Sequence, residues 1–143
     1  MTGPGSHHLV FRLDGVVAQT RLAAVVVGPG MGRLLREIAP VFLLWLFCDG
    51  QEKETAAAAE TLRLDGLVPR SRWLFASEGF RVDLPDQLVG RLMERTGAPR
   101  EEIIWIDDRP AVTSALIRAG MNAVAFVDAP RLRRNLVLRG LIK

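Results

Sequence analysis

Side chains that can take part in chemistry stand where short apolar segments of the sequence end. One such segment ends in Arg12 and Asp14, a second ends in Cys48, and a third ends in Asp107 and Asp108. Neighbouring carboxylates can transfer a proton or hold a divalent cation, a deprotonated thiol can act as a nucleophile, and a guanidinium can bind an anion. The pattern therefore indicates a polar site assembled from the ends of several strands.

The spacing of apolar residues predicts strands and helices in alternation. We expect strands over residues 9–13, 41–47, 73–76, 103–106 and 123–127, and helices over residues 31–39, 51–64, 86–96, 110–119 and 130–138. Apolar strands that alternate with helices are typical of a parallel sheet covered on both faces. The predicted class is α/β, with a three-layer, Rossmann-like, five-stranded parallel sheet. In such sheets, sites lie at the carboxyl ends of the strands.

The length and composition fit a single globular domain. The chain has 143 residues, of which 49% are hydrophobic and 24% are charged, within the usual range for one domain. We expect a disordered leader over residues 1–8, which are rich in turn formers, and one domain over residues 9–143. No apolar run reaches the roughly 18 residues that a membrane-spanning helix needs, and a single cysteine excludes an internal disulfide. We therefore expect a cytoplasmic protein.

Basic residues are concentrated at the carboxyl end of the sequence. The formal net charge is +3, and residues 129–143 contain five basic residues and no acidic residue. Five charges without interleaved aromatic residues are a weak signal for nucleic-acid binding, because a solvated helix face has the same composition. We expect neither nucleic acid nor a membrane as a partner.

The order of these motifs resembles that of the haloacid dehalogenase (HAD) superfamily, from Leu9 to Leu141. Residues 9–15, Leu-Val-Phe-Arg-Leu-Asp-Gly, match the family's first motif, an apolar strand that runs into Asp-x-Asp-Gly, except at Arg12. Cys48 follows an apolar strand where the second motif has serine or threonine, and residues 103–108, Ile-Ile-Trp-Ile-Asp-Asp, match the fourth motif. The resemblance implies a HAD-like core, and the short connections leave no room for a full cap domain.

The resemblance also implies that the family's nucleophile is missing. In the family, the first aspartate attacks phosphorus and binds Mg²⁺, the second handles the proton, and a lysine near the third strand balances charge. Asp14 remains as the candidate acid or base, whereas Val82 stands at the lysine position, next to Arg81. The degenerate site that we expect consists of Arg12, Cys48, Asp107 and Asp108.

An arginine at position 12 changes what the site can do. A guanidinium stays protonated and only donates hydrogen bonds, so Arg12 can neither attack phosphorus nor coordinate a cation. We predict that its side chain takes the place of the cation and pairs with Asp107 or Asp108. No cofactor or metal is expected on this interpretation; Mg²⁺ would be needed only by an active site, and Asp107 and Asp108 would then hold it.

Each of these residues also has a structural interpretation. Asp14 precedes a glycine, which is a favoured turn dipeptide. One of Asp107 and Asp108 is expected to cap the helix that begins at Pro110. Cys48 fits a small buried side chain better than an activated thiol, because both histidines fall in the expected leader.

Two functions of different classes follow from these residues. The first is a pseudoenzyme that acts by binding, to a protein partner or to a second copy of itself. The alternative is an enzyme with altered chemistry, in which Arg12 holds a phosphate or carboxylate substrate and Asp14 transfers a proton, with Arg81 and the loop at Gly50 as further anion-binding candidates. A metal-dependent phosphatase with another nucleophile is a third alternative, and Mg²⁺ dependence would distinguish it.

Overall fold

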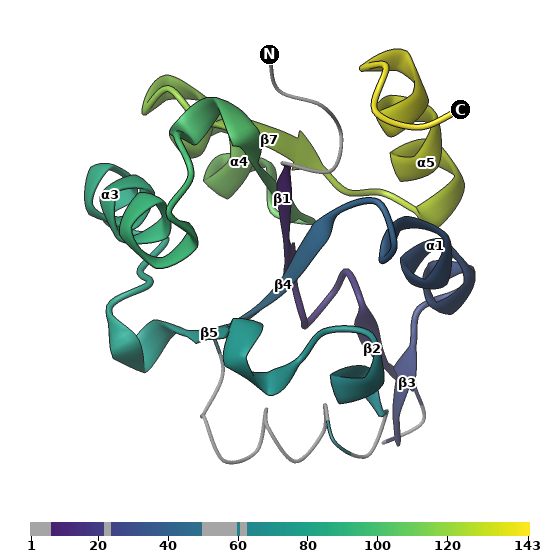
Figure 1. Ribbon diagram of the computed structural model, residues 1–143. Helices are drawn as coiled ribbons and strands as arrows, with labels where there is room; N and C mark the ends of the chain where they lie inside the picture. The colour runs from purple at the N-terminus through teal and green to yellow at the C-terminus, as the bar shows by residue number, and fades with distance from the viewer. Residues whose placement is uncertain (1–6, 22–23, 50–59, 61–62) are drawn as a thin grey trace.

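A five-stranded parallel sheet forms the centre of the computed structural model, which describes residues 7–21, 24–49, 60 and 63–143 (Figure 1). The strand order is β5-β4-β1-β6-β7, and every neighbouring pair is parallel. The strands are β1 His8–Arg12, β4 Leu43–Cys48, β5 Trp73–Phe75, β6 Ile103–Asp107 and β7 Asn122–Ala125. The predicted α/β class and parallel sheet are confirmed.

Helices cover both faces of this sheet. The helices of the described residues are α1 Met31–Ile38, α3 Pro85–Thr96, α4 Pro110–Arg118 and α5 Ala129–Leu138. Helices α1 and α5 lie on one side of the sheet, and α3 and α4 on the other (Figure 1). Successive side chains of a strand point to opposite faces, so Leu9 and Phe11 pack in one apolar cluster with α1 and α5, whereas Val10 packs in a second cluster with α3 and α4. The result is the predicted three-layer arrangement.

A short hairpin between β1 and α1 was not expected from the sequence. It consists of β2 Ala18–Arg21 and β3 Ala24–Val27, which pair antiparallel. Each strand has four residues, too few to show a clear alternation. The hairpin is the only regular structure in the described part of this connection, and no cap domain is inserted there.

The expected helix over residues 51–64 lies almost wholly outside the described residues. Its expected last residue, Leu64, begins the 3₁₀ turn Leu64–Gly66. Other 3₁₀ turns lead into or follow strands at Arg70–Arg72, Ala76–Glu78 and Arg100–Glu102. Among the described residues, no helix has the length and apolar character to cross a membrane.

His8 belongs to the sheet, although we expected it in the leader. It is the first residue of β1 and its side chain is buried. Trp45 on the neighbouring strand donates a hydrogen bond from Nε1 to His8 Nδ1, at 3.0 Å. In the register of β1 and β4, His8 pairs with Leu43, which places Trp45 two residues further on the same face. This cross-strand contact explains why a polar residue begins a core strand.

The buried His8 makes stability depend on pH. Burial lowers the pKa of His8, and Glu102 opposes this shift. The unfolded chain, whose histidine has a pKa of about 6.5, binds the proton more readily, so the free energy of unfolding falls as the pH drops below about 6.5. Urea unfolding of the wild type and of His8→Gln between neutral and mildly acidic pH measures this dependence. A wild-type pH dependence identical to that of His8→Gln would contradict it.

Candidate functional site

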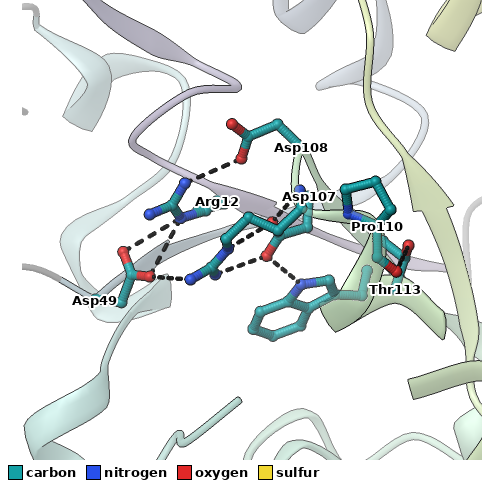
Figure 2. A network of polar contacts seen from close by, with 8 residues as sticks. Arg12, Asp49, Asp107, Asp108, Pro110 and Thr113 are labelled. Carbon is teal, nitrogen blue, oxygen red and sulfur yellow. Dashed lines mark hydrogen bonds and ion pairs between the residues drawn. The ribbon is translucent and has the colours of Figure 1, made fainter. Parts of the chain in front are cut away.

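The ends of three neighbouring strands bring five charged side chains together. Because β4, β1 and β6 are adjacent and parallel, their carboxyl ends lie at one edge of the sheet. Figure 2 shows Arg12, Asp49, Asp107 and Asp108 side by side at this edge. Arg109 completes the group, which we call the Arg–Asp network.

Arg12 joins two strand ends. Its Nη1 lies 3.0 Å from Asp108 Oδ1, and its Nε lies 3.2 Å from Asp49 Oδ2 (Figure 2). The Arg12 side chain is 17% exposed and that of Asp49 15%, so both charges are largely withdrawn from water. The pairing with one of the two consecutive aspartates was predicted from the sequence, whereas the contact with Asp49 was not.

Arg109, like Asp49, is a member of the network to which the sequence analysis assigned no role. Its Nε and Nη2 donate to the two carboxylate oxygens of Asp107, each at 2.9 Å, and its backbone N–H donates to Oδ1 at 2.9 Å. Its Nη1 lies 2.9 Å from Asp49 Oδ2. Asp49 is thus shared by two guanidinium groups. The available signal was the position of Arg109 directly after the paired acids at a strand end.

Asp107 is the most enclosed carboxylate of the network. Its side chain is fully buried, and Trp105 donates from Nε1 to Oδ2 at 3.0 Å. Burial raises the pKa of Asp107, but the hydrogen bonds from Arg109 and Trp105 outweigh burial, so the net pKa lies below its ordinary value. Asp107 is therefore ionised at neutral pH.

The expected aspartate cap of the following helix is not formed. The N-cap residue of α4 is Arg109, and no side chain bonds to the free N–H groups there. Asp107 instead accepts from the backbone of Arg109 itself. Pro110 starts the helix, where a missing N–H costs no hydrogen bond. The prediction was wrong because the carboxylates of both aspartates accept hydrogen bonds from arginine side chains instead.

Asp14 lies in the turn that follows β1 and is exposed. Its neighbour Gly15 has a φ of +82°, and a Cβ on Gly15 would lie 2.3 Å from Asp108 Oδ2. A glycine is therefore required both by the backbone conformation and by the approach of Asp108. Within the described part of the chain, Asp14 makes no ion pair with either arginine of the network.

Cys48 at the end of β4 is buried, with 1% of its surface exposed. Burial raises the pKa of the Cys48 thiol, and together with the nearby charges of Asp14 and Asp49 it brings that pKa to about 12. The thiol is protonated at neutral pH and makes a poor nucleophile.

Cys48 should therefore react only after unfolding. We expect a disulfide reagent such as Ellman's reagent to label the native chain no faster than the chain unfolds, and to label it promptly in urea. Rapid stoichiometric labelling of the native protein would contradict the burial of the thiol.

Of the other predicted anion-binding residues, Arg81 does not join the network. Arg81 forms an exposed ion pair with Asp83, with Nη2 and Oδ2 2.6 Å apart. Val82 is half-buried against the cluster under α3 and α4. Gly50 lies outside the described residues.

The side chains of the network do not fit a magnesium ion. Mg²⁺ requires oxygen ligands in a near-octahedral arrangement, but oxygens of Asp49, Asp107 and Asp108 already accept hydrogen bonds from guanidinium groups. Among the described residues, no three acidic, histidine or cysteine side chains come together in a metal-binding arrangement. With Asp14, the edge of the sheet carries four aspartates and two arginines, a formal charge of −2.

The fold was compared with known proteins. No protein-family model and no curated protein matches the sequence. A hydrolase from Streptococcus pneumoniae TIGR4 has a similar structure, with a TM-score of 0.73 and 14% identity over 91% of this chain and 97% of that one. A HAD family enzyme from Bacteroides thetaiotaomicron, in complex with magnesium and inorganic phosphate, has a TM-score of 0.71 and 10% identity over 88% and 98%.

This chain has a HAD-like fold. A HAD family hydrolase from Deinococcus radiodurans, with bound phosphate and sodium, covers 99% of both chains at a TM-score of 0.69 and 14% identity. The HAD-like core expected from the motifs, without a cap domain, is thus confirmed. At these identities, the likeness to the structural neighbours concerns the fold alone.

Proposed function

We propose that this chain is a catalytically inactive HAD-fold protein that acts by binding a protein partner. The proposal rests on one observation: Arg12, at the position that corresponds to the family's nucleophilic aspartate, is held by Asp108 and Asp49. An arginine has no lone pair with which to attack phosphorus, and it repels a cation. The side chain at this position therefore supports neither step of the family's chemistry.

The second arginine strengthens the same proposal. Arg109 donates to both oxygens of Asp107 and reaches Asp49. A divalent cation would have to displace two guanidinium groups from these carboxylates. The charge that Mg²⁺ would bring is already supplied by the protein, so the site is stable without metal.

The alternative function, an enzyme in which Arg12 binds an anionic substrate, is disfavoured by the negative charge of the site. Both guanidinium groups are engaged by carboxylates, and the aspartates at this edge outnumber them. A phosphate or carboxylate ligand would have to compete with three bound carboxylates and meet a negative surrounding. Proton transfer by Asp14 would then have no bound substrate to act on.

Binding is also consistent with the open end of the sheet. In the described part of the connection between β1 and α1, the regular structure is the short hairpin β2–β3, so no cap domain is inserted at this point. A macromolecule can approach a surface that no cap encloses, whereas a small substrate would gain little burial there.

A direct assay tests this proposal. We expect the purified chain, in millimolar Mg²⁺, to hydrolyse p-nitrophenyl phosphate and acetyl phosphate no faster than buffer. Added phosphate should leave its melting temperature unchanged in the wild type and in Arg12→Ala. Mg²⁺-dependent turnover that Asp14→Asn abolishes would overturn the proposal, and phosphate stabilisation lost in Arg12→Ala would favour the altered enzyme.

A further inference from the structure

A groove lies between α1 and α5 on the described surface. Figure 1 shows the two helices on the same side of the sheet. The groove has a volume of about 580 Å³, within the range of about 300–1,000 Å³ common for ligand sites. We call it the α1–α5 groove. It is lined by Gly30, Arg33, Leu34, Glu37, Ala129, Pro130 and Arg133. None of these residues belongs to the Arg–Asp network.

Small residues keep this groove open. Gly30 lies against Ala129, since a Cβ on Gly30 would stand 3.3 Å from the Ala129 Cβ. The helices approach at this point without a large side chain between them, and Leu34 and Pro130 complete an apolar lining. Apolar surface in a concave site favours an apolar ligand, because burial removes it from water.

The charged residues of the groove are predominantly basic. Arg133 is paired with Glu37, with Nη2 and Oε2 2.7 Å apart. Arg33 is exposed, and no ion pair of the described residues involves it. The surrounding helix α5 and the tail after it contain five basic residues and no acidic residue. A ligand with acidic groups is therefore complementary to this face.

We infer that the α1–α5 groove docks an apolar segment of a protein partner, and that acidic residues flank this segment. The inference rests on the proposed binding function and assigns it a surface. Amphipathic helices commonly bind in apolar grooves through residues spaced at i, i+3, i+4 and i+7. Acidic side chains at the edges of the apolar stripe of such a helix would meet Arg33 and Arg133, which line the groove.

A designed peptide pair provides the probe. One fluorescent helical peptide carries leucines at i, i+3, i+4 and i+7 and glutamates elsewhere, and a second carries lysines in place of the glutamates. We expect saturable binding of the acidic peptide by fluorescence anisotropy, and no binding of the lysine peptide. Arg33→Glu should weaken binding about five- to tenfold, because one surface attraction becomes a repulsion.

Arg36→Glu is the matched control for this substitution. Arg36 is exposed on the same helix but does not line the groove, so its reversal should change the affinity by less than about twofold. Equal weakening by both variants would mean that peptide binding depends on the net charge of the protein and not on the groove, and would overturn the inference. Absence of acidic-peptide binding would overturn it too.

Self-association is the remaining outcome. If sedimentation shows a concentration-dependent dimer that Arg33→Glu dissociates, a second copy fills the groove and the inferred partner is wrong. Each of these results leaves the phosphatase assay unaffected. The peptide experiments can therefore contradict the docking site without contradicting the proposed lack of catalysis, and the phosphatase assay can do the reverse.

Discussion

Asp107→Asn should lower the free energy of unfolding by about 3–5 kcal/mol, as expected when one partner of a buried ion pair is removed. Asp107 is fully buried and accepts from Arg109 twice through the side chain. An asparagine keeps the shape but removes the charge, and its amide group would face guanidinium donors with donors of its own. Urea unfolding followed by tryptophan fluorescence measures the loss.

Asp83→Asn is the control for this variant. Asp83 also pairs with an arginine, but its side chain is 60% exposed, and such surface pairs contribute little to stability. The difference between the two variants isolates the effect of burial. Comparable losses of less than about 1 kcal/mol in both would show that the Asp107–Arg109 pair is not a structural element of the site.

Arg12→Ala should also destabilise the chain, by about 3 kcal/mol, the lower end of the range for breaking a buried pair. The variant leaves Asp108 without its arginine, and leaves Asp49 with Arg109 alone. The loss is smaller than for Asp107 because the Asp108 side chain is 34% exposed and water can solvate part of its charge. Thermal and urea unfolding of the purified variant provide the value.

Two further variants assign this loss to the ion pair. Arg81→Ala removes an exposed pair and should be close to neutral. Adding Asp108→Asn to Arg12→Ala should restore part of the stability, because the uncompensated carboxylate is then neutral. An Arg12→Ala protein as stable as the wild type, or no recovery in the double variant, would show that Arg12 does not compensate these carboxylates.

The strands of the parallel sheet could be predicted from the sequence because each core strand is a short run of apolar residues. A parallel sheet places the carboxyl ends of its strands at one edge, and the resemblance to the HAD superfamily then predicted that Arg12 pairs with one of the two consecutive aspartates. The prediction could not decide between Asp107 and Asp108. In the structure Asp108 pairs with Arg12, and it also passes so close to Gly15 that a Cβ there would clash with it.

The other parts of the site depend on side-chain conformations that no local pattern encodes. Asp49 is shared between Arg12 and Arg109 only because residues from two strand ends turn toward it. Arg109 folds back onto Asp107, two residues earlier, rather than extending into solvent. His8 joins the sheet through a hydrogen bond from Trp45, a contact between neighbouring strands that are far apart in sequence.

The most direct test of the central claim is a calorimetric titration of the wild-type chain with Mg²⁺. If the guanidinium groups of Arg12 and Arg109 replace the metal, the titration shows no saturable heat, and the melting temperature is the same with and without millimolar Mg²⁺. Saturable binding that Asp108→Asn abolishes, together with a rise in melting temperature, would contradict the claim and show that the carboxylates still form a metal site.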